Sequence, residues 1–223
     1  MNFFPIFNIL SIILILSNFI NLKFKTKLNE SYLISVSIII LFSFLLNILN
    51  SNYSVNILKY FLIIYSILVI FMIPSLINSF PKINVKLNIE FIIFILLIFF
   101  LSKDRYFLDQ DEITYWGLAI KSFIYNTHDP VFFHHPIGLT LFRYLFLSNN
   151  FDEGLIIFSN NLLLVCAFLY LFYDRKINTY EKILIISIYF LLLNNLSFGF
   201  VSIYSDPIVA IFYACLLKKL FFI

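Results

Sequence analysis

Long apolar runs, most of them near twenty residues, alternate with short polar segments along this chain of 223 residues. A helix of about twenty apolar residues crosses the roughly 30 Å of hydrocarbon in a bilayer. The pattern therefore predicts an all-α, polytopic integral membrane protein with about seven transmembrane helices. The predicted spans are residues 3–22, 32–49, 57–79, 89–102, 155–173, 183–203 and 207–223.

Composition agrees with this pattern, since hydrophobic residues make up 62% of the chain and charged residues 12%. The mean hydropathy of +0.98 lies far above that of soluble proteins. The formal net charge is +3, but the basic residues are spread among short loops, so we expect no nucleic-acid partner. Cys166 and Cys215 fall within apolar runs, where a thiol acts as a small hydrophobe, and no disulfide is expected.

Loop charge predicts how the spans are oriented, because lysine and arginine collect on the cytoplasmic side of a membrane. The first loop carries Lys23, Lys25 and Lys27, whereas the second loop, residues 50–56, carries no charge. We expect the odd-numbered loops inside, and the N-terminus and a long polar insert, residues 103–154, on the external side of a bacterial inner membrane. The other basic residues of the odd-numbered loops are Lys82, Lys86, Arg175, Lys176 and Lys182.

The insert contains two predicted short helices. Residues 113–124 have apolar side chains at helical spacing, but this segment is too short and polar to span, so we expect an interfacial helix. Asp111 and Glu112 lie at its start, where the helix dipole favours carboxylates. Pro136 suits the first turn of a second, apolar helix over residues 136–147, and we expect the external loop to carry both as interfacial helices.

Several polar residues of the insert have both a functional and a structural explanation. His134 and His135 precede the second helix, where a helix N-terminus can bind an anion such as phosphate, or they shape a turn. Arg143 lies inside that helix and needs a carboxylate or a lipid phosphate as partner. Alternatively, Arg143 and Lys121 extend to the headgroups. The paired Asn160 and Asn161 favour hydrogen bonds between helices.

These segments follow one another in an informative order. The acidic pair Asp111-Glu112 follows a predicted span and precedes Trp116-Gly117 and Lys121, and a later span opens with Tyr204-Ser205-Asp206-Pro207. Between them lie the turn His135-Pro136-Ile137-Gly138 and the stretch Leu141-Phe142-Arg143-Tyr144. This order resembles the GT-C superfamily of membrane glycosyltransferases, which includes protein O-mannosyltransferases and the lipid A aminoarabinose transferase. It is most similar to uncharacterised bacterial members with an Asp-Glu-(x)3-Trp-Gly stretch and a Pro-Gly turn.

The resemblance covers about residues 90–214 and has two departures. Pro136-Ile137-Gly138 stands where members commonly have Pro-Pro-Gly, and about three extra spans precede the acidic pair. The chain is also short for the family, so we expect a truncated member. The resemblance divides it into N-terminal transmembrane helices, residues 1–88, and a GT-C-like core portion, residues 89–223, that carries the external loop 103–154.

The resemblance implies transfer of a sugar from a polyprenyl-phosphate donor to a lipid, glycan or protein acceptor at the outer membrane face. Asp111 or Glu112 would be the catalytic base, with Asp111 first by its position in the motif. The implied substrate-binding residues are Asp109, Lys121, His134, His135, Arg143 and Asp206. Among these, Lys121, His135 and Arg143 would face the carrier phosphate. A divalent cation, Mg or Mn, is left open, and Asp109 and Asp206 would hold it.

Three other classes remain as alternatives. A polysaccharide polymerase or ligase also has a large outer loop with arginine and histidine and also uses polyprenyl carriers. A transporter or flippase predicts ionisable residues at mid-membrane depth, broken helices and paired repeats. A non-catalytic membrane scaffold predicts that substitution of Asp111 is tolerated. No glycine-rich phosphate loop or His-Glu-x-x-His stretch supports a nucleotide enzyme or a zinc protease.

Overall fold

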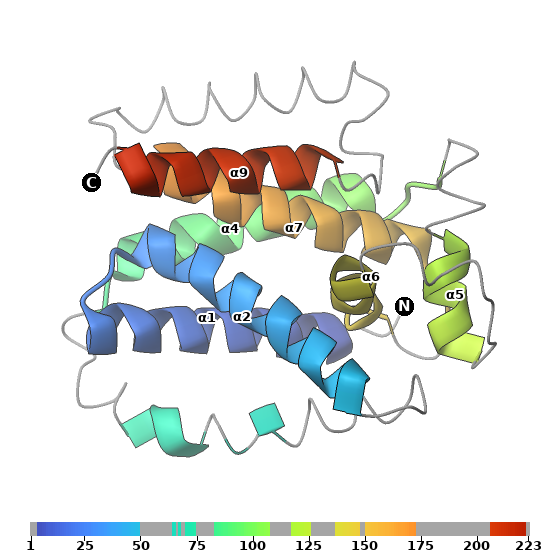
Figure 1. The fold of residues 1–223 in the computed structure, drawn as a ribbon, viewed down its shortest axis with the longest axis horizontal. Helices are drawn as coiled ribbons and strands as arrows, with labels where there is room; N and C mark the ends of the chain where they lie inside the picture. The colour runs from blue at the N-terminus through green and yellow to red at the C-terminus, as the bar shows by residue number, and fades with distance from the viewer. Residues whose placement is uncertain are drawn as a thin grey trace.

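The computed structural model describes residues 4–49, 64–65, 67, 70–74, 83–107, 117–125, 137–147, 150–172 and 206–221. These residues form helices joined by short connections and contain no strand, as expected for an all-α protein (Figure 1). The helices are α1 (Phe4–Phe24), α2 (Leu28–Leu49), α4 (Val85–Ser102), α5 (Leu118–Tyr125), α6 (Ile137–Tyr144), α7 (Glu153–Phe172) and α9 (Asp206–Phe221).

Four helices are long and apolar enough to cross a membrane, and they match four of the predicted spans. The apolar stretches are Pro5–Phe24, Leu28–Leu46, Val85–Ser102 and Glu153–Phe172. α4 is longer than the predicted span 89–102, because it begins at Val85. The predicted spans 57–79 and 183–203 lie largely or wholly outside the described residues. The predicted span 207–223 corresponds to α9, which has 16 residues.

α7 is the central helix of the described bundle. Its side chains are buried from Gly154 to Tyr170, and it packs against α2, α4, α6 and α9. An all-apolar helix can be surrounded by protein or by lipid, and α7 is surrounded by protein along nearly its whole length. By contrast, α4 buries one stripe, Leu87, Phe91, Ile95 and Ile98, and exposes the rest of its apolar surface. Such an exposed apolar face suits contact with lipid.

α1 and α2 form a tight antiparallel hairpin (Figure 1). Three residues, Lys25 to Lys27, separate the two helices, and Lys25 has a φ of 55°, in the left-handed region. Reversal after so short a connection needs a left-handed residue, which usually is glycine or asparagine. The three lysines of the first loop are therefore held at one end of the hairpin.

A polar cluster joins α1, α2 and α4 inside apolar surroundings. Asn18 and Asn88 exchange two hydrogen bonds between their amides, at 3.1 and 3.0 Å. The hydroxyl of Tyr32 donates to the amide oxygen of Asn88 at 2.6 Å, and the Tyr32 ring stacks on Phe91. Because the alternative in hydrocarbon is an unsatisfied amide, these bonds fix how the three helices pack.

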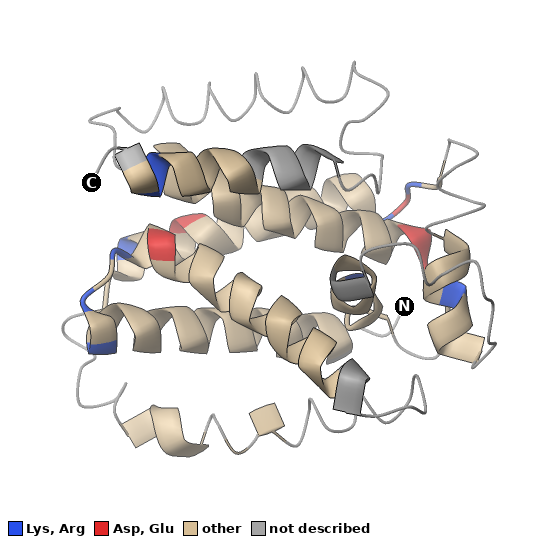
Figure 2. Cartoon of the chain, viewed as in Figure 1, with Lys and Arg blue, Asp and Glu red and all other residues tan. Residues whose placement is uncertain are grey.

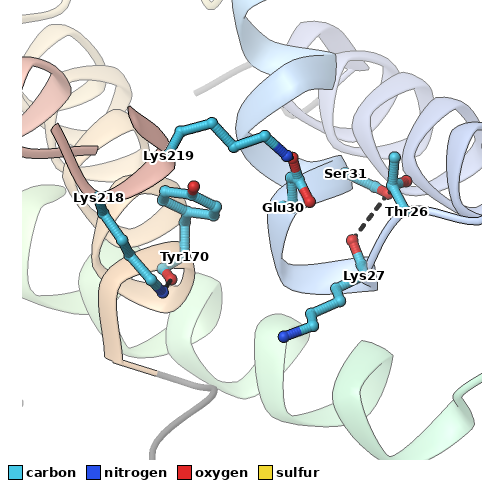
Figure 3. Close-up of polar contacts among 7 residues, drawn as sticks. All are labelled: Thr26, Lys27, Glu30, Ser31, Tyr170, Lys218 and Lys219. Atoms are coloured by element: carbon cyan, nitrogen blue, oxygen red, sulfur yellow. Dashed lines mark hydrogen bonds and ion pairs between the residues drawn. The ribbon is translucent and has the colours of Figure 1, made fainter. Parts of the chain in front are cut away.

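The last turn of α9 is tied to two other helices (Figure 3). Lys219 makes an ion pair with Glu30 at the start of α2. Lys218 donates to the backbone oxygens of Tyr170 and Leu171, the latter at 3.2 Å, and its ammonium lies over the Tyr170 ring. The final carbonyls of a helix have no partner within that helix, so Lys218 caps the C-terminus of α7.

The helices run between two different ends of the bundle (Figure 1). One end holds the α1–α2 turn and the last turns of α7 and α9, and α4 starts there. We call it the basic end, and its described lysines are Lys23, Lys25, Lys27, Lys86, Lys218 and Lys219. The opposite end holds the end of α4, the starts of α7 and α9, and α5 and α6. We call it the insert end.

Candidate functional site

The described parts of the insert form α5 and α6, which pack on each other at the insert end (Figure 1). Both helices were expected, over residues 113–124 and 136–147. α5 begins later than predicted, and residues 113–116 lie outside the described part. The rings of Phe123 on α5 and Tyr144 on α6 have their centroids 5.9 Å apart. This contact holds the two helices together.

α6 differs from an interfacial helix. Every side chain from Thr140 to Leu147 is buried, and the helix packs against α2, α5 and α7. Figure 1 shows α6 nearly end-on, whereas α1, α2 and α7 extend across the picture. The axis of α6 therefore crosses the axes of these helices. The prediction of a helix lying along the membrane surface is therefore wrong for α6. Protein surrounds its side chains from Thr140 to Leu147, including the charged Arg143.

Arg143 on α6 is fully buried, with no exposed surface. Its Nη2 donates to the side-chain oxygen of Asn160 on α7 at 2.8 Å. Asn160 stands about two turns into α7, roughly 10 Å from the helix start. The alternative in which Arg143 extends to the headgroups is therefore wrong. Its described partner is an amide, whereas a carboxylate or a phosphate was expected.

Lys121 on α5 lies nearer the surface. It is half-buried, and its ammonium sits 4.5 Å from the centroid of the Phe151 ring. A cation over an aromatic face is stabilised by the negative charge of that face, yet the ammonium keeps hydrogen-bonding capacity for another group. Of the two cationic residues predicted for the carrier phosphate whose side chains are described, Lys121 is the accessible one.

Two acids at the start of α7 have structural roles: Asp152 caps the helix, and Glu153 holds the chain that leads to Asp109. Asp152 caps α7, since its carboxylate accepts from the backbone nitrogen of Leu155 at 3.1 Å. Glu153 accepts from the backbone nitrogen of Phe107 at 2.7 Å. Phe107 is buried and stands two residues before Asp109. No role was predicted for either acid, although an acidic pair before an apolar run is a recognisable capping signal.

α4 and α7 approach each other closely at the insert end. A Cβ on Gly154 would lie 2.5 Å from the backbone oxygen of Lys103 and 2.7 Å from that of Ser102. About two turns further along α7, the amide of Asn161 donates to the hydroxyl of Ser102 at 3.1 Å. The end of α4, from which the acidic segment continues, is thus held against α7.

Asn160 and Asn161 form hydrogen bonds between helices, as predicted. Asn160 contacts α6 through Arg143, and Asn161 contacts α4 through Ser102. Adjacent residues on a helix point about 100° apart, so one pair serves two neighbours. The sequence contained the pair, but no local signal identified its partners.

Both predicted catalytic residues and several of the predicted substrate-binding residues lie outside the described part of the chain. Asp109, Asp111, Glu112, His134 and His135 are not described, so their predicted roles stay predictions. Asp206 begins α9 at the insert end, and its side chain is not described. Within the described ranges, no three His, Cys, Asp or Glu side chains are grouped as metal ligands would be. That finding does not test the cation predicted between Asp109 and Asp206.

Burial also affects Tyr144, which follows Arg143 on α6. Desolvation by the surrounding side chains raises the pKa of its phenol above the ordinary value. Tyr144 is therefore neutral at physiological pH and adds no charge beside Arg143. The positive charges described inside this end of the molecule are those of Arg143 and, closer to the surface, Lys121.

Comparison with known proteins gives this chain no relative: no family model, no curated protein and no solved structure matches it.

Proposed function

We propose that this protein is a polytopic membrane glycosyltransferase with about seven spans. It transfers a sugar from a polyprenyl-phosphate donor to an acceptor at the outer face of the membrane. The order of the acidic pair, the Trp-Gly step, the Pro-Gly turn and the second acidic site supports this function. The observation that carries most weight is the placement of Lys121 and buried Arg143 on two packed helices at one end of an apolar bundle.

The proposed reaction requires a base and a stabilised leaving group. Asp111, or Glu112 beside it, takes the proton from the acceptor hydroxyl as its oxygen attacks the anomeric carbon. The bond from that carbon to the carrier phosphate oxygen breaks, and the phosphate leaves with the electron pair. A single displacement of this kind inverts the anomeric configuration. A Mg or Mn ion held by Asp109 and Asp206 would stabilise the phosphate further.

The two described basic side chains, Lys121 and Arg143, would have different roles in this reaction. Lys121 is half-buried beside Phe151 and would contact the carrier phosphate directly. Arg143 is fully buried on the neighbouring helix, in surroundings of low polarity where a charge acts over a longer distance than in water. Held by Asn160, it would supply positive potential to the phosphate without moving. His134 and His135 remain proposed contacts of the same phosphate.

The architecture suits a lipid-linked donor. The apolar outer faces of the helices would meet the carrier tail and lipid, whereas the polar insert would meet the sugar and its phosphate. Lysines dominate the opposite end, which we assign to the cytoplasmic side of a bacterial inner membrane. The insert then faces outwards, where lipid, glycan or protein acceptors are available.

Sugar transfer in membranes tests this proposal. Membranes that contain the full reading frame are supplied with radiolabelled sugars on polyprenyl phosphate, and wild type is compared with Asp111→Asn and Glu112→Gln. Asp104→Asn is the matched control, because that carboxylate is 84% exposed and pairs only at 3.7 Å with its neighbour Lys103 among described residues. We expect transfer to fall at least a hundredfold, in line with the usual contribution of a base, in one of the first two variants alone.

Three outcomes of this experiment would contradict the proposal or one of its parts. Transfer that survives both Asp111→Asn and Glu112→Gln at equal expression would remove the acidic pair from the reaction. Transfer that is absent from wild type with every donor would contradict the glycosyltransferase function itself. An equal loss in Asp104→Asn would indicate a general effect of charge at this end.

A transporter or flippase is the second candidate, because buried Arg143 lies roughly 10 Å inside the insert end. Movement of a fluorescent polyprenyl-phosphate lipid between leaflets of proteoliposomes separates the two functions. A flippase moves this lipid without an acceptor and without sugar transfer, whereas the proposed enzyme transfers sugar and does not accelerate the movement.

A further inference from the structure

The two ends of the described bundle differ in charge (Figure 2). Among the described residues, the basic end has six lysines and two acids, Glu30 and Glu90. At the insert end, apart from buried Arg143, three basic and three acidic side chains are described. They are Lys103, Arg105, Lys121, Asp104, Asp152 and Glu153. The excess of positive charge therefore belongs to one end.

At the basic end, both described acids and three of the lysines make ion pairs or hydrogen bonds within the protein. Glu30 pairs with Lys219, and Glu90 lies 4.0 Å from Lys86. Lys218 faces the end of α7 (Figure 3). Lys23 and Lys25 are exposed at the α1–α2 turn. This turn thus presents the ammonium groups of Lys23 and Lys25 to the surroundings.

Exposed apolar side chains follow these lysines along α4 and α2. On α4, the large exposed side chains include Ile89, Ile93 and Leu96, all beyond the first turn that carries Lys86. On α2, Ile38 and Leu41 are exposed in the same way. A phospholipid has the matching arrangement, with acyl chains beside apolar side chains and a phosphate at their edge. Charge complementarity selects lipids whose headgroups are anionic.

We propose that the α1–α2 turn and the start of α4 form a docking surface for anionic phospholipid headgroups. Lys23, Lys25 and Lys86 bind the lipid phosphates, while the neighbouring faces of α2 and α4 contact the acyl chains. Glu30 and Glu90 are each engaged by a lysine of this protein, so neither repels the headgroups fully. This inference is independent of sugar transfer, since it concerns the opposite end of the molecule.

The lipid preference of the purified full chain tests the inference. Protein is placed in nanodiscs of equal parts phosphatidylglycerol and phosphatidylcholine, and the lipids retained by the protein are counted by native mass spectrometry. We expect phosphatidylglycerol to be preferred by wild type. The double variant Lys23→Gln/Lys25→Gln should lower this preference by about fivefold per lysine, the usual contribution of a lysine near an anionic surface.

The matched control is Lys103→Gln/Arg105→Gln, which removes two exposed charges from the insert end. This control should keep the wild-type preference. A salt series on wild type needs no variant, and 1 M salt should abolish most of the preference because the screening length falls to about 3 Å. Loss in both double variants, or no preference in wild type, would overturn the proposal. Loss on adding 10 mM inorganic phosphate alone would point to a free-anion site and would also overturn it.

Discussion

At the scale of single residues, the molecule uses a few polar groups inside apolar helices to fix contacts. Arg143, Asn160 and Asn161 are buried where α4, α6 and α7 meet, and each has a described hydrogen bond to another helix. A buried guanidinium is costly in an apolar environment, so its retention requires a compensating contact. Sequence alone indicated that Arg143 needed a partner, but the partner lies 17 residues away on another helix.

The bond between Arg143 and Asn160 should be measurable as coupling. We expect Arg143→Met and Asn160→Leu each to lower the free energy of unfolding. The double variant should cost less than the sum of both, by about 0.5–3 kcal/mol. Chemical unfolding in mild detergent measures all four states. Ser37→Ala, an exposed hydroxyl on α2 that bonds only its own helix in the described structure, is the control and should change little. Strictly additive losses would contradict the contact.

Gly154 gives a prediction in which two effects have opposite signs. Gly154→Ala should favour the helix by about 1 kcal/mol through propensity alone. The new Cβ, however, would meet backbone oxygens of residues 102 and 103 at 2.7 and 2.5 Å, and backbone cannot turn aside as a side chain can. We expect net destabilisation of about 1–3 kcal/mol, measured as a lower unfolding midpoint. A stabilised variant would show that α4 and α7 are less close than described.

At the scale of elements, apolar length and composition predicted the four long helices because neither property depends on distant residues. The same reasoning failed for α6. Eight apolar-rich residues suit a membrane interface and a protein interior equally well, and only the surrounding α2, α5 and α7 decide between them. The Asn18–Asn88 pair was likewise not predicted, because its members are 70 residues apart and neither has a distinctive neighbour.

The α1–α2 turn supplies a prediction for an element. Lys25 has a φ of 55°, which costs an ordinary side chain roughly 1 kcal/mol and costs glycine nothing. We therefore expect Lys25→Gly to raise the unfolding midpoint in zwitterionic detergent, where lipid charge has no part. Lys23→Gly, in the last turn of α1, should lower it instead. Destabilisation by both changes would contradict the left-handed turn.

At the scale of the whole molecule, the basic segments and the insert helices lie at opposite ends of the bundle. The α1–α2 turn, the start of α4 and the end of α9 lie together, as the alternation of basic loops predicted from sequence. The insert helices lie at the other end. Asp206 begins α9 at that end, whereas Asp109, Asp111, Glu112, His134 and His135 lie outside the described residues. The roles of these five residues rest on the order of the motifs.

The most direct test of this account is the sidedness of its two ends. Cys166 and Cys215 are buried, and replacing both by alanine gives a background for single-cysteine reporters at Lys25→Cys and Arg105→Cys. In intact cells, a membrane-impermeant maleimide should label Arg105→Cys and leave Lys25→Cys unlabelled, with the reverse in inverted membrane vesicles. Labelling of both reporters from one side, or of Lys25→Cys from outside, would place the insert away from its proposed donor and contradict the account.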